Sequence, residues 1–108
     1  MSGEPQWVRV ASKTDLLKQR RMTCRVLELD IVLIYSSHEV IALEDKCTHL
    51  GKPLHAGRIM GGTIICPFHG ACFSLKTGES LAGPAVAAVR LFATRVEGED
   101  IFLCCPGN

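Results

Sequence analysis

The sequence predicts an all-β fold, built as a small antiparallel sandwich or barrel. Three observations carry this prediction: short β-branched runs recur along the chain, glycine and polar turns separate them, and no stretch keeps a helical period. At 108 residues, 47% of them hydrophobic, the chain has the size of one domain and enough apolar side chains for its own core. We therefore expect a single domain over residues 1–108 with about ten strands.

The first half of the chain contains one short helical segment among its strands. Ser12 precedes KTDLLK and can cap a helical turn over residues 12–18. A turn at Asp30 would join two apolar runs as a hairpin, and the polar pair Ser37-His38 would form the next turn. The expected strands of this half are WVRV (7–10), MTCRVLEL (22–29), IVLIYS (31–36) and EVIALE (39–44).

The second half is punctuated by glycine. Gly61-Gly62 predicts a two-residue hairpin turn, because glycine accepts positive φ. KTGE (76–79) and EGE (97–99) predict two further turns. The expected strands of this half are RIM (58–60), TIIC (63–66), CFSL (72–75), VAAVRLFATRV (86–96) and DIFLCC (100–105).

Charge and hydropathy argue against several classes of partner. Twelve basic and eleven acidic residues give a net charge of +1, which predicts no basic field for nucleic acid or acidic lipid. The N-terminal MSGEPQWVRV does not resemble a signal peptide, and no run of eighteen apolar residues could span a bilayer. We expect a cytoplasmic protein that binds neither membranes nor nucleic acid.

Two loops are near-copies of one another: CTHLG (47–51) and CPFHG (66–70). Their candidate ligands are Cys47, His49, Cys66 and His69, and two thiolates with two imidazoles suit zinc or an iron–sulfur centre. Each loop would supply one cysteine and one histidine, which fits a single tetrahedral zinc poorly. The pattern fits a two-iron cluster better, with both cysteines on one iron and both histidines on the other.

The other histidines and cysteines are expected to be structural. His38 lies in a polar turn and His55 has no cysteine beside it, so neither is predicted to be a ligand. Without an export signal the thiols should be reduced. The apolar neighbourhoods of four cysteines predict simple packing: Cys24, Cys72, Cys104 and Cys105.

The spacing C-x-H, sixteen residues, then C-x-x-H resembles the Rieske iron–sulfur family, and the strand pattern extends that resemblance over nearly the whole chain. The resemblance implies a Rieske-type antiparallel β sandwich or barrel, with a cluster-binding subdomain of two loops at its tip, about residues 45–85. It also implies one 2Fe–2S cluster per chain. Cys47 and Cys66 would bind the inner iron, and His49 and His69 the outer one.

The subtype follows from positions where the chain departs from its membrane-bound relatives. Rieske proteins of cytochrome complexes carry a loop-to-loop disulfide, where this chain has Lys52 and Phe68. Their serine and tyrosine donors to the cluster are replaced by Ala71 and Phe73, which predicts a low reduction potential. The chain resembles instead the soluble Rieske ferredoxins of bacterial ring-hydroxylating dioxygenase systems. The same resemblance implies that Gly83-Pro84 forms a lid over the cluster.

The implied function is one-electron transfer from an NAD(P)H-dependent flavoprotein reductase to a terminal oxygenase, without catalysis on a substrate. Both partners would dock transiently at the His49/His69 tip. The alternatives are the small subunit of an NAD(P)H-dependent nitrite reductase and a structural zinc module. An apolar collar is expected around the tip, formed by Leu50, Pro53, Leu54, Pro67, Phe68 and Pro84.

Overall fold

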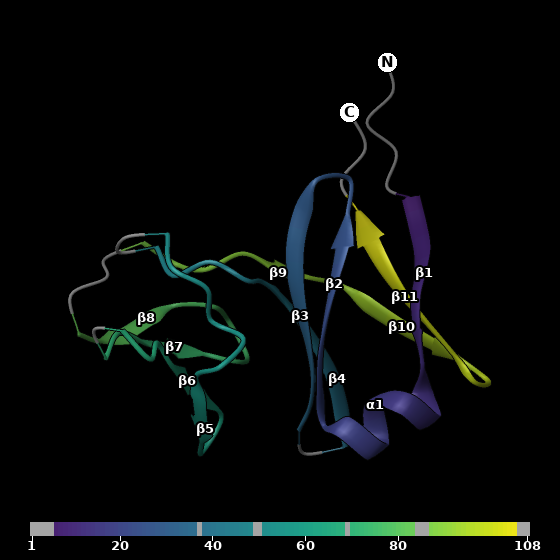
Figure 1. Cartoon of the computed structure of the whole chain (residues 1–108), viewed down its shortest axis with the longest axis horizontal. Coiled ribbons are helices and arrows are strands. Elements are labelled where there is room, and N and C mark those ends of the chain that lie inside the picture. The colour runs from purple at the N-terminus through teal and green to yellow at the C-terminus, as the bar shows by residue number, and fades with distance from the viewer. Residues whose placement is uncertain (1–5, 37, 49–50, 69, 84–86, 106–108) are drawn as a thin grey trace.

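The chain folds into three antiparallel sheets and one short helix (Figure 1). The computed structural model describes residues 6–36, 38–48, 51–68, 70–83 and 87–105. Sheet A has the order β1-β11-β10, sheet B the order β2-β3-β4-β9, and sheet C the order β5-β6-β7-β8. The all-β prediction is confirmed.

The elements are best given sheet by sheet. Sheet A contains β1 (Gln6–Ser12), β10 (Thr94–Glu97) and β11 (Asp100–Cys105). Sheet B contains β2 (Arg21–Val26), β3 (Leu29–Ser36), β4 (Glu39–Glu44) and β9 (Leu91–Phe92). Sheet C contains β5 (Arg58–Met60), β6 (Thr63–Ile65), β7 (Cys72–Ser74) and β8 (Ser80–Ala82). The helix α1 (Lys13–Gln19) follows β1.

Sheet B is the wall shared by two cores. On β3, Ile31 and Leu33 face the core that sheet B forms with sheet A, whereas Val32 and Ile34 face the core it forms with sheet C. All four side chains are buried, because alternate residues of a strand point to opposite faces and both faces are covered. The unbroken apolar run IVLI therefore reflects two-sided burial, and it ties sheet C to the rest of the molecule.

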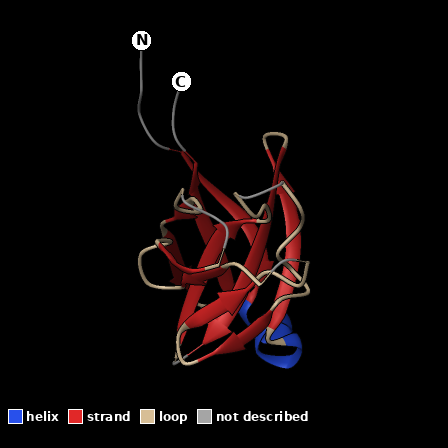
Figure 2. Cartoon of the chain, turned by 90° about the vertical axis from the view of Figure 1, so that its left-hand side faces the viewer, coloured by secondary structure: helices blue, strands red, loops and turns tan. Residues whose placement is uncertain are grey.

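The helix confirms the cap predicted at Ser12. The Ser12 hydroxyl accepts a hydrogen bond from the Asp15 amide, and Leu16 buries its side chain in the core between sheets A and B. Arg20 ends the helix with a left-handed φ of 67° and donates its amide to the Leu16 carbonyl. Figure 2, which looks at the molecule from the sheet C side, shows the helix at one end of the strands.

The predicted turn at Asp30 is wrong. The β2–β3 turn is formed by Leu27 and Glu28, both with positive φ of 51° and 69°, as a two-residue hairpin turn requires. Asp30 lies inside β3 opposite Arg25, and their side chains form an exposed ion pair of 3.2 Å. Leucine and glutamate rarely adopt positive φ, so no turn signal is visible in the sequence at these positions.

The predicted strand over residues 86–96 is also wrong. Within its described residues, 87–96, strands form only at Leu91–Phe92 and in Thr94–Glu97, and the chain passes from sheet B to sheet A between them (Figure 1). Val89 buries its side chain in the core under sheet C. Its amide donates to the Gly78 carbonyl, and this hydrogen bond belongs to no β-sheet ladder. The short β8 was not predicted. The Gly61-Gly62 turn is confirmed, with φ of 55° and 79°.

Candidate metal centre

The first cysteine loop is a compact turn that follows β4. The Cys47 amide donates to the Lys52 carbonyl at 2.7 Å, and the Gly51 amide donates back to the Cys47 carbonyl at 2.7 Å. Gly51 has a φ of +72°, which a side chain would make strained. These two bonds join the start of the first loop, at Cys47, to its end, at Gly51 and Lys52.

The second loop has the same construction between β6 and β7. The Cys66 amide donates to the Ala71 carbonyl at 2.7 Å, and the Gly70 amide donates to the Cys66 carbonyl at 3.1 Å. Gly70 has a φ of +77°. In both loops cysteine is therefore the first residue and glycine the fifth of a six-residue turn. The repeat seen in the sequence is a repeat of backbone structure.

Both cysteines point into the core shared by sheets B and C. Cys47 and Cys66 are each 1% exposed and belong to the cluster that contains Ile64 and Phe73. A bare thiolate would be costly in such apolar surroundings, whereas a thiolate bound to a cation is neutralised. Two buried, water-excluded thiols at equivalent places on matched loops therefore fit the inner half of a two-iron cluster.

The structure places only part of the predicted ligand set. His49 and His69 lie outside the described residues, so their positions as ligands remain a prediction. Among the residues that are described, no group of three or more His, Cys, Asp or Glu side chains could hold a metal ion. The observed half of the candidate site is thus the cysteine half.

Both described ends of the segment after β8 contact a cysteine loop. A Cβ on Gly83 would lie 2.6 Å from the Cα of Ala71 and 2.9 Å from the Gly70 carbonyl oxygen, so the segment presses on the second loop. At its other end, the Thr48 hydroxyl of the first loop donates to the Ala87 carbonyl at 2.7 Å. Gly83 therefore packs on the second cysteine loop, and its role in a lid over the cluster stays a prediction; Pro84 is outside the described residues.

Asp45, which the sequence analysis missed, organises the first loop. Its side chain is 8% exposed, and one oxygen accepts the amides of Leu54 and His55 at 2.6 and 2.7 Å. The other oxygen lies 2.7 Å from His55 Nδ1. His55, which was expected to have no special role, is thus a structural partner of Asp45. The one available signal was a carboxylate two residues before Cys47.

Arg21 joins this loop region to the edge of sheet B. Its guanidinium donates to the carbonyls of His55 and Gly57, at 2.5 and 2.7 Å. Gly57 has no room for a side chain, because a Cβ there would lie 2.3 Å from the Ile65 carbonyl oxygen. Residues 54–57 are therefore clamped between β2 and β6.

The residues that surround the cysteines are apolar. Ala71 and Phe73 are fully buried, at the positions where the family resemblance implies hydroxyl donors in other members. Of the predicted collar, Pro53, Pro67 and Phe68 are exposed, whereas Leu50 and Pro84 lie outside the described residues. Leu54 is fully buried, so its assignment to the collar is wrong; it packs in the core instead.

The remaining cysteines and His38 lie elsewhere. Cys24 packs against the core between sheets A and B, as predicted. Cys72 and Cys104 are half-buried, and the Cys105 side chain is not described. His38 is exposed in the β3–β4 turn with a φ of 66°.

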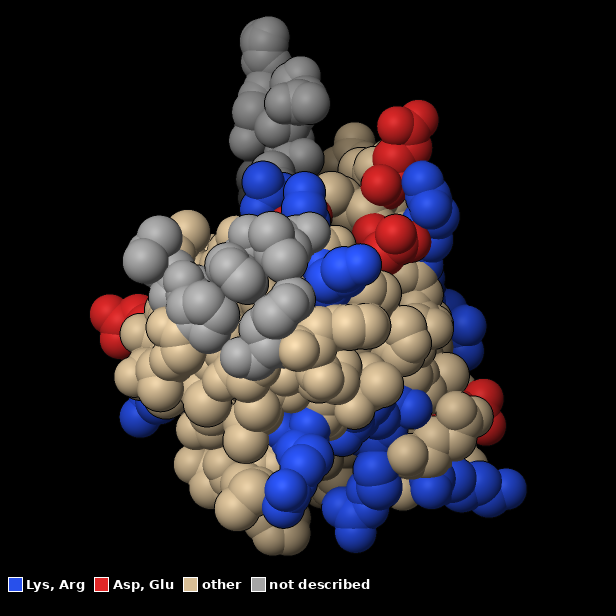
Figure 3. Space-filling view, turned by 60° about the vertical axis from the view of Figure 1, so that its left-hand side comes forward, with Lys and Arg blue, Asp and Glu red and all other residues tan. Residues whose placement is uncertain are grey.

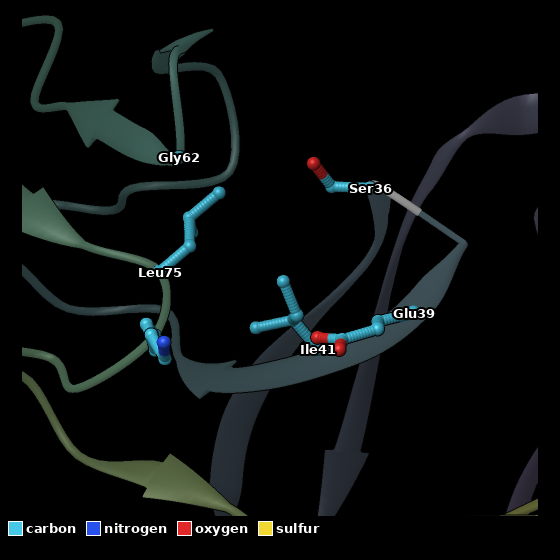
Figure 4. Close-up of a pocket in the computed structure, with 6 residues that line it drawn as sticks. Ser36, Glu39, Ile41, Gly62 and Leu75 are labelled. Atoms are coloured by element: carbon cyan, nitrogen blue, oxygen red, sulfur yellow. The ribbon is translucent and has the colours of Figure 1, made fainter.

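A cavity of about 210 Å³ opens between sheets B and C at the end away from the cysteine loops (Figure 4). Gly62 precedes β6 and Leu75 follows β7, whereas the second cysteine loop joins the opposite ends of these strands. The cavity therefore takes no part in the candidate centre.

In the described part of the chain, no helix has the length and apolar character to cross a membrane.

Comparison with known proteins supports the assignment of the loops. The family model of the Rieske 2Fe–2S domain matches residues 6–93. The 3-phenylpropionate/cinnamic acid dioxygenase ferredoxin subunit of Shigella boydii is 36% identical over 77 residues, which are 70% of this chain and 73% of that protein. Human apoptosis-inducing factor 3 is 34% identical over 73 residues, 68% of this chain but only 12% of that longer protein.

A solved structure agrees over almost the whole length. One chain in the complex of reduced oxygenase and oxidised ferredoxin of carbazole 1,9a-dioxygenase superposes with a TM-score of 0.83 and 25% identity, covering 94% of this chain and 95% of that one. The matched cysteine loops, their burial and the extent of the family match lead to one conclusion: this chain belongs to the Rieske 2Fe–2S family, and its cofactor is a 2Fe–2S cluster.

Proposed function

We propose that this protein is the ferredoxin of a ring-hydroxylating oxygenase system. It takes single electrons from an NAD(P)H-dependent flavoprotein reductase and passes them to a terminal oxygenase. One observation carries the proposal: two buried cysteines occupy the same position in two identically hydrogen-bonded loops. The ferredoxin subunit and the oxygenase–ferredoxin complex among its relatives supply the partner class.

The proposed ligands are Cys47 and Cys66 for the inner iron and His49 and His69 for the outer iron. When bound, the cluster supplies one-electron redox chemistry. The chain contributes two thiolates held in an apolar core, and two neutral imidazoles in place of two further thiolates. It thereby leaves the centre less negative than a four-cysteine site would, which favours reduction. Ala71 and Phe73 offer no hydroxyl donors, which favours the low end of the Rieske potential range.

The protein's own residues also set how the centre is held. The hydrogen bonds of Asp45 and Thr48 fix the first loop, and Gly83 covers the second. We propose that residues 1–108 form one cytoplasmic domain whose cluster-binding part spans about residues 45–85. Electrons would enter and leave at the tip that carries the two histidines.

Iron and acid-labile sulfide analysis of the purified protein tests the ligand set. We expect about two irons and two sulfides per chain, the content of one 2Fe–2S cluster. After reduction we expect an electron spin resonance signal with a low average g value. Replacing His69 with Cys should lower the reduction potential, because it adds one negative charge to the cluster. A loaded His69→Cys variant with the wild-type potential would contradict the assignment.

Reconstitution tests the partner class. The ferredoxin, combined with a reductase and a terminal oxygenase of a ring-hydroxylating system, should sustain NAD(P)H-dependent oxygenation, and its omission should stop turnover. Efficient turnover without the ferredoxin would refute the carrier function.

A further inference from the structure

The small net charge of the chain conceals a separation of charge between its two parts. The cluster-binding part, residues 45–85, contains four basic and two acidic residues, a net charge of +2. The rest of the chain contains eight basic and nine acidic residues, a net charge of −1. The part of the molecule that holds the cluster is therefore positive, and the part built from sheets A and B is negative.

Two lysines bring this positive charge to the cysteine loops themselves. The Lys52 ammonium lies 5.5 Å from the centre of the Phe68 ring, so this cation–π contact joins the first loop to the second. Lys46 extends along the first loop, since a Cβ on Gly51 would lie 3.6 Å from its Cε. Both lysines are exposed, and in the described part of the chain no carboxylate forms an ion pair with either.

The surface between these charges is apolar. In this part of the chain Phe68 is 53% exposed and Leu81 is 56% exposed, and Pro53 and Pro67 of the two loops are also exposed. Figure 3 shows a broad uncharged surface on this side of the molecule, with Lys and Arg around it and Asp and Glu toward its margins. An exposed aromatic residue, apolar neighbours and a basic rim are the ordinary components of a protein-binding surface.

We propose that this surface docks a protein whose electron-exchange site is acidic, with carboxylates around an apolar centre. This inference deepens the proposed function. It rests on that function in one respect, because it assumes that the docked protein exchanges an electron with this chain. The positive cluster-binding part attracts an acidic partner, and the negative part built from sheets A and B repels it. These two effects steer the encounter and fix its orientation. Lys52 and Lys46 supply the charge, and Phe68 supplies the apolar contact.

Reaction of the reduced holoprotein with small charged oxidants tests the charge at the electron exit without any partner. The probes are hexacyanoferrate(III), an anion, and hexaammineruthenium(III), a cation. We expect the rate with the anion to fall as salt is added, and the rate with the cation to rise. Lys52→Glu should slow the anionic reaction about five- to tenfold at low salt and speed the cationic one.

The matched control is Lys18→Glu on α1, which changes the net charge equally but lies on the negative part of the chain. It should change both rates less than about twofold. Equal effects of the two variants, or a salt dependence of the opposite sign, would overturn the inference. A protein that holds no reducible cluster would instead refute the proposed function, so the two failures are distinguishable.

A peptide that alternates glutamate and leucine represents the acidic partner surface. It should inhibit the oxidation of the wild-type protein by hexacyanoferrate(III), and Lys52→Glu or Phe68→Ser should weaken that inhibition at least about fivefold. A lysine–leucine peptide of equal length should not inhibit. Co-sedimentation with phosphatidylserine vesicles that Lys52→Glu abolishes would overturn the inference, because the surface would then recognise anionic lipid.

Discussion

Sheets A and B and the smaller sheet C hold themselves together by different means. Strands β1 to β4 and β11 are six to eight residues long, whereas all four strands of sheet C have three residues. A three-residue strand makes few ladder hydrogen bonds, and so sheet C depends on its apolar contact with sheet B and on side-chain clamps such as Asp45 and Arg21. The part that carries the candidate centre is therefore the part that local changes should loosen first.

The two parts also differ in which residue types adopt left-handed backbone conformations. Six of the seven described glycines with positive φ lie within residues 46–90. All four described non-glycine residues with positive φ lie outside that range: Arg20, Leu27, Glu28 and His38. The cluster-bearing part thus uses residues suited to tight turns, whereas the larger part accepts strain at its turns because its long ladders offset the cost.

The largest effect is expected from Gly57→Ala. Its Cβ would lie 2.3 Å from the Ile65 carbonyl oxygen and 3.1 Å from that of Leu54, and neither backbone group can move without disturbing β6 or the clamped loop. We expect a loss of about 3 kcal/mol or more in the free energy of unfolding. Denaturant titration of the variant measures it.

Gly61→Ala is the control for Gly57→Ala, since it also adds one methyl group to a glycine of sheet C. Nothing lies within 4 Å of a Cβ at Gly61, so only its φ of +55° opposes the change. This should cost about 1 kcal/mol. Equal losses at the two positions would show that contact with the Ile65 carbonyl does not constrain the loop.

Asp45→Ala should have the next largest effect. It removes the acceptor for two backbone amides and for His55 Nδ1 in a place where little water reaches. We expect a loss of about 2 to 4 kcal/mol, and faster hydrogen exchange at Ile64 and Phe73 of sheet C than at Ile31 of sheet B. The holoprotein should also lose its cluster colour faster in the presence of an iron chelator.

Asp30→Ala is the matched control, because it removes a carboxylate from an exposed ion pair with Arg25 on β2. It should cost about 0.5 kcal/mol or less and leave the exchange of sheet C unchanged. If Asp45→Ala raised exchange equally in all three sheets, Asp45 would stabilise the whole fold and not the loop.

A gain of stability is expected in the larger part, at the β2–β3 turn. Replacing Leu27-Glu28 with Asn-Gly keeps the two-residue turn and supplies residues that accept positive φ. Because Leu27 is 66% exposed, no core contact is lost. The free energy of unfolding should rise by about 1 kcal/mol, and a fall would show that the Leu27 side chain contributes packing that outweighs the strain.

These turns also explain how much of the structure could be predicted from the sequence. Gly61-Gly62 was found because glycine signals its own geometry, and the matched loops at Cys47 and Cys66 were found because ligands and glycines repeat together. Leu27-Glu28 was missed because neither residue signals a turn. Val89 was predicted to lie in a strand and Leu54 in the exposed collar, and both predictions are wrong. The apolar character of a residue indicates that it is buried, but it does not indicate which sheet or loop covers it. Asp45 was missed because its partners are backbone amides, which every sequence contains.

The smallest effect concerns pH and the attachment of α1 to sheet A. Hydrogen bonds from Thr14, first from its side chain and then from its amide, lower the pKa of Glu99 below its ordinary value of 4.5. A carboxylate whose pKa is lowered by folding stabilises the fold above the unfolded-state pKa, and this contribution is lost as pH falls through the folded-state pKa. Wild type should therefore be slightly more stable than Glu99→Gln at pH 7, and the difference should vanish in acid below the folded-state pKa. Urea midpoints for the two proteins, measured at steps from neutral pH downward, test this. Parallel curves that keep a constant separation at every pH would show that the charge of Glu99 contributes nothing, and that only the geometry of its contact with Thr14 holds the start of the helix.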